Sequence, residues 1–183
     1  MLGLKRGTVK LSENHEEWKN LFEIEKKLLM GIFGDLVLRI EHIGSTAIPG
    51  VPAKPIIDIR LAVNSIDDEY IKQFVEPLEK LGYYYMHKFD DRHFFAKGPE
   101  EKRTHHLSIV EYGSDSWKDS ILFRDYLINN DSACGKYSKL KVDLAKKFAN
   151  DRPSYTKAKE EFIEDIIKRL NLCNFYKSVK SML

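Results

Sequence analysis

The chain has 183 residues, of which 43% are hydrophobic and 32% are charged, with only 10 Gly and 6 Pro. This composition excludes collagen-like, low-complexity and globally disordered chains, and predicts a globular protein. The 30 Lys and Arg residues outnumber the 28 Asp and Glu residues by only two. Because a dedicated nucleic-acid binder carries a larger basic excess, RNA is a possible but unfavoured partner.

The apolar runs of the chain are only a few residues long, whereas a helix that crosses a bilayer needs about 20 apolar residues. No apolar stretch of the kind found in signal peptides follows Lys5 and Arg6. We therefore expect a soluble, cytoplasmic protein without a membrane partner. Cys134 and Cys173 lack a metal-ligand spacing and are too few for a disulfide scaffold, which predicts free thiols.

Apolar periodicity divides the chain into helices and strands. Spacings of three and four residues mark helices, and β-branched or alternating apolar residues mark strands. Gly82 and Gly98 supply a helix end and a turn, Asn14 with Glu17 predicts a capping box, and Ser154 predicts an N-cap. The predicted elements are a helix over 14–32, strands over 36–43 and 56–63, a helix over 66–81, strands over 83–88, 92–97 and 104–110, and helices over 117–128, 133–148 and 155–172.

Strands concentrate in the first two thirds of the chain and helices in the last third, which predicts an α+β fold, a sheet packed by helices. Short links between the strands over 83–110 favour an antiparallel meander. No linker or internal repeat is visible. We expect one domain over 1–183, with a core over about 9–112 and a C-terminal helical segment over about 115–172.

The segment between the first two predicted strands carries the most chemical information. Gly44, Ser45 and Thr46 directly follow a strand. Glycine permits close backbone approach, and hydroxyls and N–H groups can donate to phosphate oxygens. The same tripeptide is also consistent with an ordinary turn.

Asp58 interrupts an otherwise apolar strand, where an ionised carboxylate is costly unless it is paired, hydrated or bound to a cation. Alternation places Asp58 and Arg60 on one strand face, and His106 and Ser108 on the corresponding face of another strand. We expect these four side chains to meet near the Gly44 turn. An ion pair of Asp58 with Arg60 or Lys54 is the simpler alternative.

Several ordered motifs resemble the GrpB family, a branch of the nucleotidyltransferase superfamily. Residues 42–46 and 54–59 resemble its turn and first metal-binding strand, and 92–98 and 105–114 resemble its middle strands. Its helical end is similar to segments such as 123–127. The likeness runs over roughly residues 9–170, and several motifs in order are more specific than any one.

The resemblance implies a nucleotidyltransferase-like mixed sheet packed by helices. It also implies binding of a nucleoside triphosphate with magnesium at Ser45 and Asp58, and transfer of a nucleotidyl group to an unknown acceptor. Members that catalyse transfer usually carry a second carboxylate where this chain has Arg60. One carboxylate with phosphates and waters can still hold one magnesium ion. Glu41 and Glu111 are out of phase with the polar face.

Two residues are candidates for catalysis, Asp58 and His106, with Asp58 also the candidate metal ligand. His106 can orient a phosphate, act as a general base, ligate a metal or serve as a structural hydrogen-bonding residue. His105 is expected to face the core. The candidate nucleotide-binding residues are Gly44, Ser45, Thr46, Lys54, Arg60, Arg92, Ser108, Tyr155 and Lys159.

Two further features leave alternatives open. Arg92 is favoured over His93 as the residue that faces the pocket. Eight basic residues between Lys136 and Lys159 form either a funnel for an anion or a solvated helical face.

Three functions are consistent with these residues. The first is nucleotidyl transfer. The second is a non-catalytic module that binds a nucleotide or another phosphorylated small molecule, which Arg60 in place of a carboxylate favours. The third is an interaction domain whose polar face meets a protein partner. The sequence leaves the acceptor, the base preference and the oligomeric state open.

Overall fold

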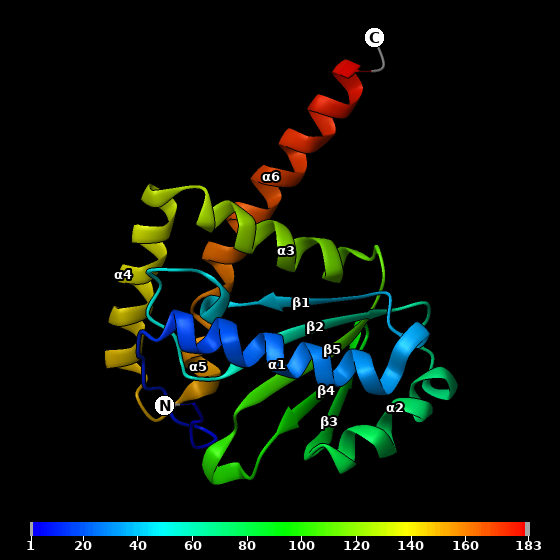
Figure 1. Ribbon diagram of the computed structural model, residues 1–183. Coiled ribbons are helices and arrows are strands. Elements are labelled where there is room, and N and C mark those ends of the chain that lie inside the picture. The colour runs from blue at the N-terminus through cyan, green and yellow to red at the C-terminus, as the bar shows by residue number, and fades with distance from the viewer. Residues whose placement is uncertain (1, 182–183) are drawn as a thin grey trace.

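The computed structural model describes the backbone of residues 2–181 and the side chains of residues 2–173. Helices and strands follow one another much as the apolar periodicity predicts (Figure 1). Their bounds are α1 His15–Phe33, β1 Arg39–Ile43, β2 Ile57–Val63, α2 Asp68–Lys80, β3 Tyr83–Phe89, β4 Arg92–Lys97, β5 His105–Glu111, α3 Asp115–Ile128, α4 Asp131–Lys147, α5 Arg152–Lys157 and α6 Glu160–Ser181.

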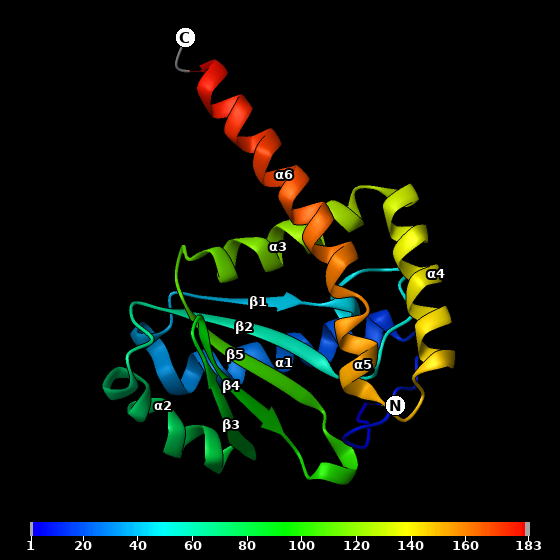
Figure 2. The same cartoon turned by 180° about the vertical axis from the view of Figure 1, so that it is seen from behind.

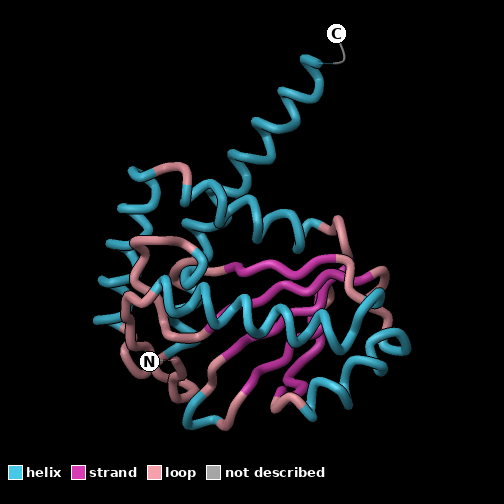
Figure 3. Tube along the Cα trace, viewed as in Figure 1, coloured by secondary structure: helices cyan, strands magenta, loops and turns pink. Residues whose placement is uncertain are grey.

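The sheet is mixed and has five strands in the order β1-β2-β5-β4-β3. It forms the centre of the molecule, with helices around it (Figure 3). β2 and β5 run parallel, and every other neighbouring pair is antiparallel. The predicted meander of β3, β4 and β5 is therefore confirmed, as is the α+β class. β2 lies between two other strands, which explains its nearly continuous apolar sequence.

One face of the sheet is covered by α1 and α2 (Figure 1). The core there joins the inward residues of β2 and β5, such as Ile59 and Leu107, to residues of the two helices, such as Leu29 and Phe74. Because strand side chains alternate, Asp58 and His106 must project from the opposite face. The core thus orients the polar residues.

The opposite face is partly covered by α5 and the first turns of α6, as the view from behind shows (Figure 2). A second apolar cluster holds this part of the chain in place. Ile48 and Val51 of the β1–β2 loop pack there with residues of α3, α4 and α6, among them Phe123, Tyr137 and Ile166. Beyond that cluster α6 projects from the body. No helix of the described residues is long and apolar enough to span a bilayer.

Three details differ from the sequence-based expectations. The Asn14 side chain makes no capping hydrogen bond. A short 3-10 turn at Gly34–Leu36 delays the first strand to Arg39. The helix expected over 155–172 is two helices, and Asp151 rather than Ser154 caps the first, because the Asp151 carboxylate accepts from the Ser154 N–H at 3.1 Å. The C-terminal residues 182 and 183 lie outside the described part.

Candidate functional site

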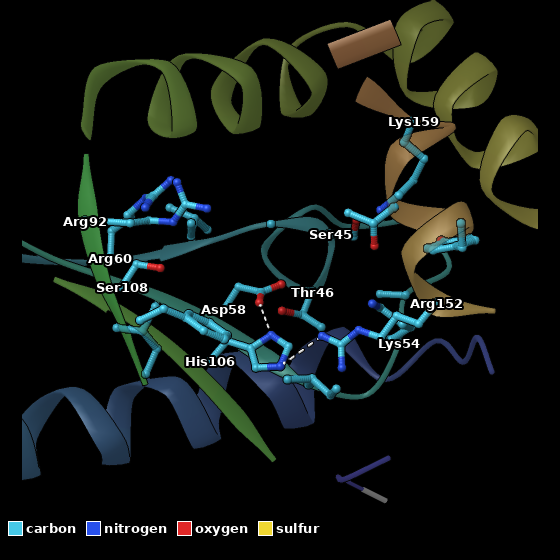
Figure 4. A pocket seen from close by; sticks show the side chains of 18 of the residues that line it. Ser45, Thr46, Lys54, Asp58, Arg60, Arg92, His106, Ser108, Arg152 and Lys159 are labelled. Atoms are coloured by element: carbon cyan, nitrogen blue, oxygen red, sulfur yellow. Dashed lines mark hydrogen bonds and ion pairs between the residues drawn. The ribbon is translucent and has the colours of Figure 1, made fainter. Parts of the chain in front are cut away.

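A hollow of about 400 Å³ opens on the sheet face opposite α1, between β2, β5 and the C-terminal helices. We call it the basic hollow. Its floor is the sheet, and its walls come from the β1–β2 loop, α4, α5 and the link to α6. Segments far apart in the sequence therefore build one site (Figure 4).

Gly44 brings the β1–β2 loop against Asp58. Its φ angle of +68° lies in the left-handed region, which side chains other than glycine seldom adopt. A Cβ atom at this position would lie 2.6 Å from Asp58 Oδ2. Glycine is thus required both by conformation and by space. Ser45 and Thr46 follow in a 3-10 turn on the lining of the hollow, where Thr46 is buried and its Oγ1 lies 2.9 Å from His42 Nε2.

Asp58 and His106 are direct neighbours across the parallel β2–β5 pair. His106 Nδ1 and Asp58 Oδ1 are 2.9 Å apart, and Arg152 Nη2 lies 3.0 Å from His106 Nε2. Because a guanidinium only donates, Nε2 must accept, and Nδ1 carries the proton toward Asp58. This chain of hydrogen bonds runs from the sheet to α5 (Figure 4).

The charge state of Asp58 follows from its neighbours. Burial opposes ionisation, but the hydrogen bond and charge of His106, with Lys54 and Arg152, outweigh it and lower the pKa of Asp58 to about 2. Burial lowers the pKa of His106, although Asp58 opposes this effect. At neutral pH the pair therefore consists of a carboxylate and a neutral imidazole.

Positive side chains dominate the basic hollow. Figure 4 shows Arg60 and Arg92 at one end and Lys159, Arg152 and Lys54 at the other, with Asp58 between them. Asp58 is the one acidic side chain on its lining among the described residues. The six basic residues that line it are Lys54, Arg60, Arg92, Lys141, Arg152 and Lys159.

Burial and mutual repulsion weaken the charge of several of these bases. Burial, with Arg152 and Lys159 nearby, lowers the pKa of Lys54 to about 7. Burial also lowers the pKa of Lys159 to about 8, with Arg152 adding to the effect and Asp58 opposing it. Both ammonium groups lie over the Tyr155 ring, at 5.5 Å for Lys54 and 4.5 Å for Lys159. An anion bound in the hollow would therefore relieve the repulsion between these bases.

Lys141 is the most constrained of these bases. Its side chain is only 2% exposed. Its Nζ atom has no hydrogen-bond partner within the described part of the protein, although the Tyr137 ring lies 5.4 Å away. Burial holds the pKa of this ammonium well below its usual value. A buried, unpaired ammonium is unfavourable, so its position on the wall requires an explanation.

The sequence alone does not distinguish Lys141 and Arg152 from the other bases between Lys136 and Lys159. The stretch divides: Lys141, Arg152 and Lys159 line the hollow, whereas Lys139 and the other lysines are exposed. A signal for Lys141 was present, because it follows the buried Tyr137 by four residues and so shares its helix face.

The structure places every predicted site residue on the lining of the basic hollow. Their roles toward a ligand stay predictions. These residues are Gly44, Ser45, Thr46, Lys54, Asp58, Arg60, Arg92, His106, Ser108, Tyr155 and Lys159.

The geometry also decides several alternatives left open by the sequence. Asp58 hydrogen-bonds to His106 rather than pairing directly with Arg60 or Lys54. Arg92 faces the hollow, whereas His93 points to the other face and bonds to the Ile66 carbonyl at 2.9 Å.

Three further side chains lie outside the hollow, as predicted. Glu41 is held by Arg124 at 2.7 Å. Glu111 is exposed at the end of β5. His105 is buried on the core side near Tyr83.

The donor set bears on the magnesium expectation. In the described part of the chain, no group of three or more His, Cys, Asp or Glu side chains is arranged to hold a metal. A pair of divalent ions therefore does not fit. A single magnesium ion fits, because it needs only one or two carboxylates when phosphates and waters complete its shell. Asp58 would hold it through Oδ2, since Oδ1 bonds to His106.

Known proteins share both the sequence and the fold. The family model described as GrpB protein matches residues 8–169. The chain is 42% identical over 176 residues to the glutamate-rich protein GrpB of Alkalihalophilus pseudofirmus, covering 93% of this chain and 100% of that one. The conserved protein GrpB from Enterococcus faecalis matches with a TM-score of 0.79 and 34% identity, over 87% of this chain and 96% of that one.

A more distant likeness concerns the fold alone. The Cid1 poly(U) polymerase, in a crystal structure with MgATP bound, matches with a TM-score of 0.52 and 12% identity, over 74% of this chain and 44% of that chain. The sheet and its flanking helices are therefore arranged as in a nucleotidyltransferase. With the family model covering most of its length, this chain belongs to the GrpB family.

Proposed function

We propose that the protein binds the polyphosphate of a nucleotide, in the class of nucleoside triphosphates, in the basic hollow. The observation that carries the proposal is Lys141, whose ammonium is buried without a hydrogen-bond partner among the described residues. Removing such a charge from water costs several kcal/mol unless an opposite charge compensates it. A phosphate group in the hollow would supply both that charge and hydrogen-bond acceptors.

Two other donors favour an anionic ligand. The Tyr155 hydroxyl is fully buried, and neither it nor Arg60 Nη1 has a hydrogen-bond partner in the part of the chain that the structure describes. Buried polar atoms normally have a hydrogen-bond partner. A phosphate would supply acceptors for Lys141, Tyr155 and Arg60 together. The planar Arg60 group can also bind two phosphate oxygens at once.

The spacing of the charges favours several phosphates over one. Arg60 and Arg92 lie at one end of the hollow, and Lys54, Arg152 and Lys159 lie at the other (Figure 4). An extended anion would reach both ends, and it would approach Asp58 where the loop turns at Gly44. A polyphosphate chain has that shape, which is why a nucleoside triphosphate is the preferred class.

Calorimetric titration with tripolyphosphate and with ATP tests this function. Both should bind the wild type, and Lys141→Met should weaken tripolyphosphate about tenfold or more, since one lost charge-assisted bond is worth 1.5–3 kcal/mol as an order of magnitude. Lys139→Met is the matched control, because Lys139 lies on the same helix but is exposed and pairs with Asp143. Absence of tripolyphosphate binding, or equal weakening by both variants, would contradict the proposal.

Nucleotidyl transfer to a hydroxyl acceptor is the second candidate. It is supported by the fold shared with a polymerase whose structure contains MgATP, and by the contact of the Gly44 turn with Asp58. In this function one magnesium ion on Asp58 Oδ2 would align and neutralise the phosphates. Magnesium should then tighten ATP binding to the wild type but not to Asp58→Asn. An equal magnesium effect in both proteins would reject the metal role of Asp58.

A further inference from the structure

A second hollow, of about 450 Å³, adjoins the basic hollow on the side of the N-terminal segment and α5. Four residues line both hollows: Phe94, His106, Arg152 and Thr156. The two therefore meet at His106, the residue that bonds to Asp58. We propose that this second hollow receives the planar ring of the same ligand whose phosphates bind the basic hollow. This inference rests on the proposed function.

The walls of the second hollow suit a ring. Met86, Phe94, Ala96 and Pro153 give it an apolar wall, and charged residues such as Arg103 and Lys157 line the rest of it. Aromatic side chains stack on bases, and methionine adapts to apolar surfaces and contacts rings favourably. Ligand sites commonly combine such apolar walls with a few oriented polar groups.

Two of the four basic residues that line this hollow, Arg103 and Arg6, already have partners. The buried Arg103 guanidinium donates through Nη1 to the carbonyls of Ala96 and Gly98, and its Nη2 lies 3.8 Å from Met86 Sδ. Arg6 pairs with Glu100. These bonds occupy both guanidinium groups, and the Arg103 contact holds Met86 in place on the wall.

Strand pairing fixes the position of Phe94 relative to the phosphate site. On the paired strands β4 and β5, Phe94 is opposite Ser108, and Ala96 is opposite His106. The Phe94 and His106 rings are 5.2 Å apart between centroids. A ligand with phosphates beside Asp58 would thus place its next group against Phe94. A nucleobase, which is flat and apolar on its faces, matches that surface.

Binding of ATP and of tripolyphosphate, compared across two phenylalanine variants, tests the inference. Wild type should bind ATP more tightly than tripolyphosphate. Phe94→Leu should weaken ATP about five- to tenfold while changing tripolyphosphate less than about twofold, because leucine keeps an apolar side chain beside His106 but removes the aromatic face that a base stacks on. Phe89→Leu is the matched control, because Phe89 lines the basic hollow but not the second hollow. Its ring centroid lies 3.9 Å from the Arg92 guanidinium carbon. Phe89→Leu should change both ligands equally.

Methyl NMR of methionine gives a readout that does not depend on affinity. The Met86 resonance, assigned with Met86→Leu, should shift with ATP and much less with tripolyphosphate. Met30 on α1 is the internal reference, because it lies outside both hollows. Equal affinities for both ligands with an unshifted Met86 signal would overturn the ring site while leaving the phosphate site intact. Failure of tripolyphosphate to bind would instead overturn the proposed function.

Discussion

His106 donates from Nδ1 to Asp58 Oδ1 over 2.9 Å because the two residues are opposite each other on paired parallel strands. The backbone ladder, and not a loop, sets their separation. Side-chain exposure is 39% for Asp58 and 12% for His106, so the carboxylate is open to the hollow while the imidazole is largely enclosed. The pair is therefore a fixed part of the sheet.

Acid should lower the folding stability of the wild type because Asp58 becomes protonated. A carboxyl with a pKa lowered to about 2 stabilises the folded state above its ordinary pKa, and that stabilisation is lost as pH falls toward the lowered value. Between about pH 5 and pH 2, the difference in unfolding free energy between wild type and Asp58→Asn should shrink by about 1 kcal/mol, allowing for solvent screening. Urea unfolding at several pH values measures it.

Asp143→Asn is the control for this acid effect. Asp143 is an exposed carboxylate paired with Lys139 on α4, and salt screens such a pair. The difference in unfolding free energy between Asp143→Asn and wild type should therefore vanish in high salt, whereas the difference between Asp58→Asn and wild type should persist. If the difference in unfolding free energy between wild type and Asp58→Asn stayed constant over the whole pH range, Asp58 would not have a lowered pKa.

Gly44→Ala should destabilise the protein more than Gly50→Ala does. Both glycines have a positive φ, +68° and +78°, so each variant loses about 1 kcal/mol from backbone strain. Only the Cβ at Gly44 meets a neighbour, Asp58 Oδ2 at 2.6 Å, whereas the space around Gly50 is empty. Gly44→Ala should lose about 1–2 kcal/mol more, and it should bind tripolyphosphate more weakly. Equal losses in chemical unfolding would contradict this contact.

Polyphosphate binding should take up protons near neutral pH. Burial lowers the pKa of Lys54 to about 7 and that of Lys159 to about 8, so both are partly deprotonated there in the free protein. A bound anion favours the charged form and raises both values. Affinity should therefore fall as pH rises from about 6 to 9. Calorimetry in buffers of different ionisation enthalpy counts the protons, and Lys54→Met should reduce the uptake.

Lys141→Met should stabilise the ligand-free protein. Because burial lowers the pKa of Lys141 well below its usual value, folding must either remove a proton from this amine or bury its charge. An apolar side chain of similar length avoids that cost, and a gain of about 1 kcal/mol or more is expected. Thermal unfolding without ligand measures the gain, with Lys139→Met expected to be near neutral. A lower melting temperature for Lys141→Met would show that the ammonium is satisfied in the free protein.

The sequence was sufficient for the sheet and for its polar face. Period-two alternation in β2 and β5 predicts that Asp58, Arg60, His106 and Ser108 share one side, and the structure bears this out. Alternation is informative here because the other face packs against helices, and a one-residue slip would bury these polar residues. The position of the Gly44 turn could also be predicted, because the strands on both sides of it are recognisable from their apolar residues.

The far wall of the hollow was harder to predict. Lys141 and Arg152 reach it through the packing of α4 and α5 on the rest of the protein, which no local pattern encodes. The split between α5 and α6 was missed because apolar periodicity continues through it, while the break lies at residues 158 and 159. The second hollow depends on Phe94 meeting a helix that follows more than 50 residues later in the sequence.

The wall that α5 contributes has a consequence for biosynthesis. Asp58 and His106 belong to strands made early, whereas Arg152, Tyr155 and Lys159 emerge from the ribosome much later. A nascent chain that still lacks α5 and α6 would have the sheet floor but only part of its cationic enclosure. Ligand capture should therefore begin only once α5 and the residues up to Lys159 have been made, so a bound anion would favour chains that contain this segment over shorter ones.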